Sequence, residues 1–497
     1  MANCFGVKWA KPADRWLSLA ILVVVKPPEN QAVTRKAQNK TSIYPDESLL
    51  RYLTTVPDGI VRQLYAYFAS MTKRSKLLLV AAATFSATAL LTIVALNFSA
   101  GEKRPDQQLP RLYSAKDPQF KRVMGSLLGP DIVGGNKVEE LINGDQIFPA
   151  MLDAIKDAKS TINFETYIYW SGDIGKSFAD ALAERAKAGV RVNVLIDWVG
   201  SAKMKDDLLD AMRASGVNIR KFHKPHWYTL AKLNNRTHRK LLIVDGAIGF
   251  TGGVGIAEKW TGAGQDADHW RDSHFRVEGP VVAQIQATFL DNWMKVTGQV
   301  LHGENYFPAL KPAGDSETQM FSSSPTNGSE NMALMYQMAL TAADKSVDLS
   351  MAYFVPDGRN SKILIEAMQR GVKLRIITPG KITDTQTVRA ASRQTWGPLL
   401  KAGAEIYEFQ PTMYHCKVMI IDGFMVSVGS TNFDNRSFKL NDEANLNIYD
   451  AKFASRQTRI FEDDLKKARR ISFEEWDSRP FKERALEIVG VILSSQL

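Results

Sequence analysis

Two stretches of this 497-residue sequence, THRKLLIVDG (237–246) and YHCKVMIIDG (414–423), share the spacing His-x-Lys-x-x-x-x-Asp. The motif residues are His238, Lys240 and Asp245 in the first stretch and His415, Lys417 and Asp422 in the second. The chain has only seven histidines, so two of them in the same local pattern indicate a duplication rather than a chance match. In each copy, the apolar run between Lys and Asp is typical of a strand in a buried parallel or mixed sheet.

The duplication extends to the segments that precede the motifs. The stretch INFETYIYW (162–170) reads as a strand because it is rich in β-branched and aromatic residues, and VDLSMAYFVP (347–356) is its counterpart. Each is followed by a helical pattern, a glycine and another apolar run. The two glycines, Gly189 and Gly371, fall at the helix end, where glycine is favoured. We therefore predict β-α-β units in both halves.

These repeats predict an α/β fold of two homologous lobes, each with a central mixed β-sheet flanked by helices. We place the first lobe at residues 120–310 and the second at residues 311–497. Each motif strand leads into a glycine-containing turn, GFTGGVG (249–255) or SVGSTN (427–432). The repeat is far longer than the unit of a solenoid, which favours two lobes over a repeat array.

The residues before the first lobe predict a membrane anchor. The segment 77–98 carries no charge and is long enough to cross a bilayer as a helix. We expect a leader over residues 1–76, the transmembrane anchor over 77–98 and a polar linker over 99–119. Basic residues precede the apolar segment, which favours a cytoplasmic N-terminus and exported lobes. The stretch from Met71 resembles a natural start, so the leader is either native or an upstream extension.

Composition sets broad limits on the partners. Hydrophobic residues make up 45% of the chain and charged residues 23%, as in ordinary folded proteins. The net charge of +10 favours an anionic partner, which is a phospholipid, a nucleic acid or a phosphorylated substrate. The two cysteines, Cys4 and Cys416, have neither a zinc-binding nor a redox spacing, so we expect no metal site and no structural disulfide.

The motif residue types suit metal-free cleavage of a phosphodiester. Such an enzyme needs a nucleophile that forms a covalent intermediate, a general acid for the leaving oxygen, and fixed cations for the non-bridging oxygens. On an extended strand, His and Lys two residues apart point to the same face. Pairing the lobes about a pseudo-two-fold axis would bring two imidazoles and two ammonium groups around one phosphate. One imidazole then attacks, and the other protonates the leaving group.

Four carboxylates accompany this motif. Asp245 and Asp422 belong to it, but they lie seven residues after their histidines and therefore face the opposite side of a straight strand. We expect these two aspartates to stabilise turns. Asp272 and Glu443, downstream of the two motifs, are candidates to orient the imidazole rings beside the substrate. The alternative for each is an ordinary salt bridge.

Basic residues outside the motifs leave alternatives open. His223 and His226 either line the substrate entrance or lie in an exposed loop. His274 is expected to be a packing or loop residue. Arg389 and Arg393 lie four residues apart on an expected helix, where they either bind a second lipid phosphate or form a solvated face.

The chain resembles the phospholipase D superfamily, whose signature is this duplicated motif, and within it the bacterial cardiolipin synthases. The resemblance runs from Phe148 to the C-terminus, through stretches such as WRDSHFRVEGP (270–280) and VGSTNFDNRSFKLNDEANLNIYD (428–450). It implies a phosphohistidine mechanism with no metal or other cofactor. The resemblance implies that His238 is the nucleophile and His415 the general acid. It implies that Lys240 and Lys417 bind the phosphate.

The glycine turns differ between the two copies. Ser430 and Asn432 match the Gly-Ser-x-Asn element of the superfamily, which contacts the phosphate region, and the resemblance makes them substrate-binding residues. In the first copy, Gly255 stands where members often have Asn. The first half-site thereby lacks a hydrogen-bonding amide, which puts a fully symmetric site in doubt.

The resemblance implies a phosphatidyltransferase anchored by a single span in a bacterial inner membrane. Such an enzyme passes a phosphatidyl group to an alcohol, for example phosphatidylglycerol. The expected partners are an anionic phospholipid and the membrane, and not nucleic acid. The alternatives are a phospholipase D that produces phosphatidic acid, an exported nuclease or other phosphodiesterase, and a non-catalytic membrane scaffold. The acceptor and the oligomeric state stay open.

Overall fold

The computed structural model describes residues 67, 70–97, 109–223, 235–324 and 331–480. His226 and Cys4 lie outside these residues. The chain divides into two compact units, Met1–Ser99 and Ala100–Leu497.

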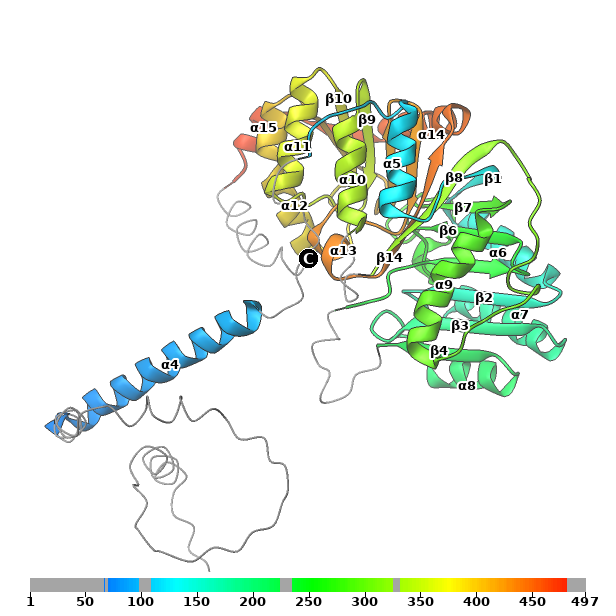
Figure 1. Ribbon diagram of the computed structural model, residues 1–497, viewed down its shortest axis with the longest axis horizontal. Helices are drawn as coiled ribbons and strands as arrows, with labels where there is room; N and C mark the ends of the chain where they lie inside the picture. Colours follow the sequence, from blue (N-terminus) through cyan, green and yellow to red (C-terminus); the bar gives the residue numbers. More distant parts are fainter. Residues whose placement is uncertain (1–66, 68–69, 98–108, 224–234, 325–330, 481–497) are drawn as a thin grey trace, which may run out of the picture. The chain divides into compact units, whose positions relative to one another are not determined.

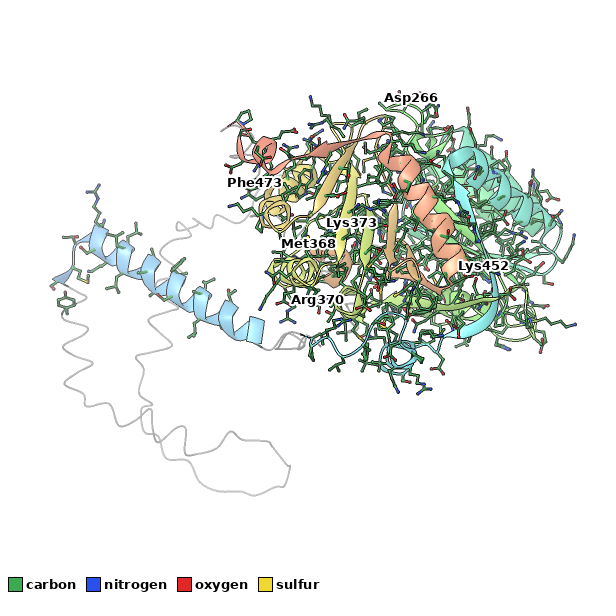
Figure 2. All side chains as sticks on the ribbon, turned by 90° about the horizontal axis from the view of Figure 1, so that it is seen from above. Asp266, Met368, Arg370, Lys373, Lys452 and Phe473 are labelled. Carbon is green, nitrogen blue, oxygen red and sulfur yellow. The ribbon has the colours of Figure 1, made fainter. Side chains whose placement is uncertain are left out.

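The described part of the first unit is dominated by helix α4 (Lys73–Asn97). Its stretch Lys73–Thr92 has a mean hydropathy of 1.5, and none of that stretch is buried within the protein. Side chains project from α4 on every side, as Figure 2 shows. By length and composition this helix is able to cross a membrane.

The second unit contains one continuous sheet of fifteen strands within the described residues. In spatial order, its first half is β4 (Asn218–Phe222), β3 (Arg191–Asp197), β2 (Thr161–Thr166), β5 (Leu241–Val244), β6 (Ile248–Gly252), β7 (Ser273–Glu278) and β1 (Val133–Ile142). The second half continues with β8 (Ser316–Ser323), β14 (Glu443–Tyr449), β13 (Met425–Gly429), β12 (Lys417–Ile421), β9 (Ser346–Met351), β10 (Lys373–Pro379), β11 (Glu405–Phe409) and β15 (Ala468–Ile471). The halves repeat one strand order and meet at the antiparallel pair β1–β8.

This arrangement confirms the predicted α/β fold of two homologous lobes with mixed sheets. In each lobe, two β-α-β units give parallel strands, β2–β3–β4 and β9–β10–β11. The motif strands β5 and β12 then run antiparallel to β2 and β9. Gly189 and Gly371 adopt φ angles of 92° and 96° directly after the helices, as the sequence predicts.

Helices cover both faces of the sheet (Figure 1). Those of the first lobe are α6 (Asn143–Asp157), α7 (Asp173–Lys187), α8 (Asp206–Ala214), the short 3-10 helix η2 (Glu258–Trp260) and α9 (Val282–Thr297). Those of the second lobe are α10 (Asn331–Ala342), α11 (Gly358–Gln369), α12 (Gln386–Lys401), α13 (Asn435–Lys439), α14 (Ala451–Leu465) and α15 (Phe473–Asp477). One hydrophobic core contains Phe289 of α9 together with Phe453 of α14. This shared core fixes the two lobes against each other.

Helix α5 (Pro118–Leu128) departs from the predicted lobe boundary at residue 120. Its Phe120 and Met124 are buried in the core of the second lobe, although the helix precedes the first lobe in the chain. The predicted linker over residues 99–119 also ends early, because the Ala115 N–H donates to the Ala342 carbonyl at 3.1 Å. An amphipathic helix buries its apolar side against whichever surface is open to it, and the sequence alone does not identify that surface.

Candidate active site

Each motif histidine lies just before its strand, on a segment that pairs with the opposite lobe. The His238 N–H donates to the Asp442 carbonyl at 2.9 Å, and the His415 N–H donates to the Arg271 carbonyl at 2.8 Å. Isolated parallel β-bridges, Thr237 to Asp442 and Arg271 to Tyr414, fix the same crossings. The backbone therefore holds both histidines at the seam between the lobes.

Each imidazole is bound by a carboxylate from the other lobe. His238 Nδ1 lies 3.0 Å from both carboxylate oxygens of Glu443, the first residue of β14. His415 Nδ1 lies 2.7 Å from Asp272 Oδ2, just before β7. A proton on Nδ1 satisfies each carboxylate and leaves Nε2 as the nitrogen available for chemistry.

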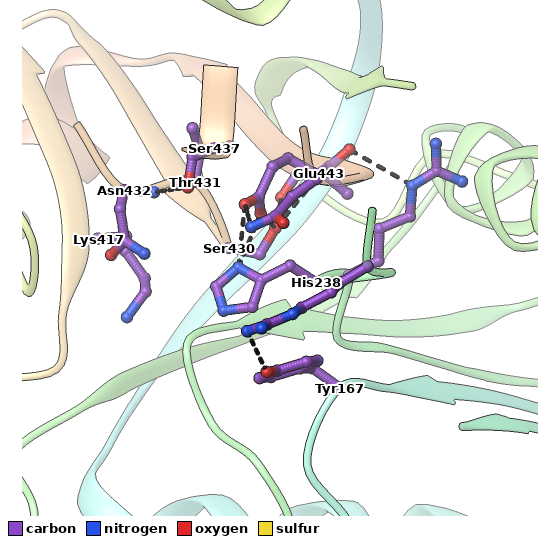
Figure 3. Close-up of polar contacts among 12 residues, drawn as sticks. Tyr167, His238, Lys417, Ser430, Thr431, Asn432, Ser437 and Glu443 are labelled. Atoms are coloured by element: carbon purple, nitrogen blue, oxygen red, sulfur yellow. Dashed lines mark hydrogen bonds and ion pairs between the residues drawn. The ribbon is translucent and has the colours of Figure 1, made fainter. Parts of the chain in front are cut away.

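Further donors hold the two carboxylates in place, and Figure 3 shows those around Glu443. Ser430 Oγ and Asn441 Nδ2 donate to Glu443, the latter at 3.2 Å. Trp260 Nε1 donates to Asp272 at 2.9 Å. Ser430 thus lies behind the imidazole, where it supports the carboxylate, and is not among the described residues that line the cavity.

The two carboxylates differ in their charge state. Burial raises the pKa of Glu443 to about 7, although nearby Lys240 opposes this shift. Burial acts in the same direction on Asp272, but His415 and Lys417 outweigh it and hold the Asp272 pKa below its ordinary value. Asp272 is therefore fully ionised at neutral pH, whereas Glu443 titrates near neutrality.

The lysines of the two motifs lie beside the histidines. Lys240 Nζ donates to the His238 carbonyl and Lys417 Nζ to the His415 carbonyl, each at 2.7 Å. Burial lowers the pKa of Lys240 to about 7 and lowers that of Lys417 as well. Burial and these cations also lower the pKa of both histidines, that of His238 to well below its ordinary value. An anion that enters this cluster would be stabilised by the ammonium groups and would in turn raise the pKa values of the lysines and histidines.

A single cavity of about 370 Å³ opens between the lobes at this point. Both histidines line it, together with Lys240 and Asn432. Its other walls are mostly aromatic or charged and are formed by residues that include Tyr167, Trp170, Arg236, Trp260, Trp270, Tyr353, Asp384, Asp434 and Arg436. A polar centre with aromatic walls suits an amphiphilic substrate whose charged part is small.

The first half-site has no counterpart of the Asn432 side chain because the space is filled. A Cβ atom on Gly255 would lie 2.9 Å from Ile168 Cβ and 3.2 Å from a ring carbon of Trp260. A Cβ atom on nearby Gly253 would lie 2.2 Å from Asp272 Oδ1. Glycine is therefore needed at both positions, and the Trp260 ring occupies the room that the second lobe gives to an amide.

Trp260 was not identified from the sequence as a site residue. Trp260 occupies the position in the first lobe that Ser437 occupies in the second. Ile256 and Phe433 form equivalent isolated β-bridges in the two lobes, and Trp260 and Ser437 each lie four residues after them. Ser437 binds Glu443 just as Trp260 binds Asp272. In the sequence, the glycine at position 255, where family members often have Asn, was the signal that another side chain fills this part of the first half-site.

The motif aspartates lie at the far ends of their strands and do not line the described cavity. Asp245 accepts hydrogen bonds from the backbone N–H groups of residues 159–161 at 2.7–2.8 Å. Asp422 accepts from those of residues 344–346 at 2.7–3.2 Å. Both adopt positive φ angles, 52° and 54°. This geometry supports a role in stabilising the turn after each motif strand.

The other basic residues that were singled out in the sequence and are described by the structure are not among those that line the cavity. Arg389 and Arg393 both pair with the buried Glu408, at 2.5 and 2.9 Å, so the helix face they form is largely occupied by this ion pair. His223 Nδ1 is hydrogen-bonded to the Asn235 carbonyl. His274 is buried on β7, as a packing residue would be, and neither ring nitrogen has a hydrogen-bond partner among the described residues.

Comparison with known proteins agrees with this geometry. A family model described as "Cardiolipin synthase, PLD-like domain" matches residues 151–293 and 336–465. Cardiolipin synthase 1 of Bacillus anthracis is 34% identical over 367 residues, which cover 72% of this chain and 72% of that protein. The major cardiolipin synthase ClsA of Bacillus subtilis (strain 168) is 33% identical over 362 residues, covering 72% and 75%.

One solved structure shows the same fold. The phosphatidylserine synthase of Haemophilus influenzae Rd KW20 aligns with a TM-score of 0.60 and 13% sequence identity. The alignment covers 77% of this chain and all of that one. At this level of identity the likeness concerns the fold alone.

Proposed function

Because the chain belongs to the cardiolipin synthase family of phospholipase D-like phosphatidyltransferases, we propose that it transfers a phosphatidyl group from one phospholipid to the hydroxyl of another, such as phosphatidylglycerol. The observation that carries this proposal is the pair of histidines, each bound by a carboxylate of the opposite lobe and both facing one cavity. A polar centre of this kind is what in-line displacement at a phosphorus atom requires.

The first step forms a covalent intermediate on His238. Its Nε2 attacks the donor phosphorus, a P–N bond forms, and the P–O bond to the donor's head-group alcohol breaks. His415 gives its proton to the departing oxygen. Lys240 and Lys417, as ammonium groups, neutralise the non-bridging oxygens during this step.

The unequal carboxylates support this assignment of roles. The ionised Asp272 favours a proton on His415. Glu443 is only partly ionised at neutral pH, and the pKa of His238 is well below its ordinary value, mainly because of burial. His238 is therefore neutral, as a nucleophile must be. A bound phosphodiester adds negative charge, which favours protonation of His415 at the moment when an acid is needed.

The second step releases the phosphatidyl group. Neutral His415 removes the proton from the acceptor hydroxyl, the acceptor oxygen attacks phosphorus, and the P–N bond to His238 breaks. With phosphatidylglycerol as acceptor the product is cardiolipin. With water the same step gives phosphatidic acid, so hydrolysis is the second candidate activity of this site.

The proposal also includes membrane anchoring by helix α4. We infer that this helix spans the bilayer once and that the lobes lie on the exported side, because Lys73, Arg74 and Lys76 precede its apolar stretch. A reporter enzyme that works only after export, fused to the C-terminus, tests this orientation. Activity of a reporter that works only in the cytoplasm would reverse it.

The test of function uses the full-length protein purified in detergent. Incubated with labelled phosphatidylglycerol, it should produce cardiolipin and glycerol, and His238→Ala should produce neither. The matched control, His302→Ala, changes an exposed histidine and should retain activity. A parallel incubation with plasmid DNA tests the nuclease alternative. Nicking that His238→Ala abolishes, without any lipid product, would overturn the proposal.

A further inference from the structure

We propose that Arg236 and Arg436 form a second anion subsite in the catalytic cavity, which binds the phosphodiester of the acceptor lipid. The inference rests on the proposed transfer function and adds to it the place of the second substrate. It concerns the step in which the phosphatidyl group is attached to His238 and the acceptor must be held beside it.

The two arginines share one wall of the cavity. Both line it, and Tyr167 lies with them: Arg236 Nη1 donates to the Tyr167 hydroxyl at 2.8 Å, a contact drawn in Figure 3. Burial lowers the pKa of Arg436, the next cause is the positive charge of Arg236, and nearby Asp434 opposes both without cancelling them. Two like charges held side by side raise the free energy of the empty site. An anion placed between them relieves that repulsion, so the wall favours a negatively charged ligand.

The cationic wall has no equivalent across the pseudo-two-fold axis. Arg236 lies two residues before His238, and the residue two before His415 is Met413, which is fully buried. Arg436 lies one residue before Ser437, and its counterpart before Trp260 is Lys259. Lys259 pairs with Asp268 and is not one of the described cavity residues.

Another part of the cavity carries a different set of groups. Tyr353 donates a hydrogen bond to Asp384 there, and the Asp384 carboxylate acts to raise the pKa of His415 and of Lys417. The charge in the cavity is thus distributed unevenly. Arg236 and Arg436 both act on Tyr167, whereas Asp384 acts on His415. Asp434 also lines the cavity and offsets part of the positive charge of Arg436. This uneven distribution of charge would not help to bind a substrate whose only charge is the reacting phosphate. A substrate with a second, off-centre charge would be oriented by it.

The chemistry of the acceptor accounts for this off-centre charge. The reacting phosphate already has Lys240 and Lys417, which lie within the two motifs beside the histidines. The attacking hydroxyl of phosphatidylglycerol is joined to that lipid's own phosphodiester by a three-carbon glycerol unit. When the hydroxyl reaches the phosphorus on His238, the second phosphate must therefore rest in the same cavity. Guanidinium groups match phosphate oxygens in a planar, two-point contact.

The test measures how the intermediate on His238 is partitioned between acceptors. The variants are Arg236→Met, which introduces the residue of the other lobe at the related position, and Arg436→Gln. The full-length protein in detergent receives labelled phosphatidylglycerol, with and without ethanol. The products are cardiolipin, phosphatidic acid and phosphatidylethanol. Because all three arise from one intermediate, their ratios do not depend on how much of the enzyme is folded.

The proposal gives a specific result. Each substitution should lower the ratio of cardiolipin to phosphatidic acid on the order of tenfold, the effect of losing a charge-assisted contact. The ratio of phosphatidylethanol to phosphatidic acid should change by less than about twofold, because ethanol has no phosphate to bind. Lys259→Gln, at the related position outside the cavity, should leave both ratios as in the unaltered protein.

Other results would contradict it in distinguishable ways. If all three products fall in proportion, the arginines serve the donor phosphate or the fold, and the second subsite is wrong while the proposed function stands. If both ratios fall equally, the arginines do not distinguish a charged acceptor from a neutral one, and the subsite is again wrong. If the unaltered protein yields only phosphatidic acid, the proposed transfer itself fails.

Discussion

Both carboxylate oxygens of Glu443 lie 3.0 Å from Nδ1 of His238, although the two residues belong to different lobes and are far apart in the chain. The reverse exchange joins His415 to Asp272 at 2.7 Å. Each half of the cavity is therefore completed by the other half, and the position of each imidazole depends on the packing between the lobes.

Replacing Glu443 with Gln should reduce kcat by at least about a hundredfold, because the amide has no charge to stabilise an imidazolium and a single oxygen to accept the Nδ1 proton. The rate of cardiolipin formation by the purified protein measures this effect. Glu462→Gln, on α14 outside the cavity, serves as the matched control and should retain its rate. An unchanged kcat in Glu443→Gln would contradict the role of this carboxylate in positioning His238.

Replacing Trp260 with Phe should lower kcat roughly tenfold, since Asp272 loses the indole donor at 2.9 Å while the ring remains. The control is Trp293→Phe, on the buried face of α9, where the indole nitrogen has no hydrogen-bond partner among the described residues. Both changes remove the same atoms from a buried position. Equal losses of kcat in the two variants would mean that packing, and not the bond to Asp272, explains the effect.

Asp245→Asn and Asp422→Asn should lower stability rather than the chemical rate. Each aspartate accepts backbone N–H bonds from three successive residues, and an amide offers only one accepting oxygen. Asn tolerates the positive φ angle at both positions, so the substitution tests the hydrogen bonds alone. We expect a loss of about 1–3 kcal/mol in unfolding free energy, measured by denaturant titration. A large fall in kcat for a variant that is fully folded would instead indicate that the aspartate has a direct catalytic role.

His274→Asn should flatten the dependence of stability on acid pH. Burial lowers the pKa of His274 to about 4, whereas the unfolded chain takes up this proton near pH 6.5. The stability contributed by the neutral form is thus complete above about pH 6.5 and is lost as the pH falls towards 4. Asparagine is the natural replacement because Asn445 holds the same register on β14 opposite Gly429 as His274 holds on β7 opposite Gly252.

The expected size of this effect is about 2 kcal/mol between pH 8 and pH 5. Chemical denaturation of both proteins at these two pH values gives the difference, so that the other titrating groups cancel. Equal losses of stability in the variant and the unaltered protein would show that His274 takes up no proton on unfolding in this range.

The sequence predicted those parts of the molecule that depend on local pattern. The duplicated motif, the β-α-β units and the helix ends at Gly189 and Gly371 were all readable because spacing and glycine conformation act over a few residues. The lobes follow from these, since two copies of one pattern adopt one fold twice.

The features that the sequence did not predict depend on contacts between residues far apart in the chain. Asp272 and Glu443 were recognisable as candidates, but the exchange between lobes depends on backbone bridges such as Thr237 to Asp442, which leave no local pattern. The burial of α5 against the second lobe and the pairing of Arg389 with Glu408 are tertiary contacts of the same kind. The sequence left open whether Arg389 and Arg393 bind a phosphate or face solvent, because helix spacing alone does not reveal their pairing with Glu408.

The exchange of carboxylates also determines when, during synthesis, the site is first assembled. A ribosome makes His238 long before it makes Glu443, so a first lobe that has already folded holds an imidazole with no acid to orient it. Asp272, the partner of His415, is synthesised before His415 itself. The strand that begins at Glu443 must still be added before the sheet is complete. If the proposed transfer is correct, a chain that ends before β14 should therefore be inert towards lipids, and the active site is completed only when the second half of the sheet has been added.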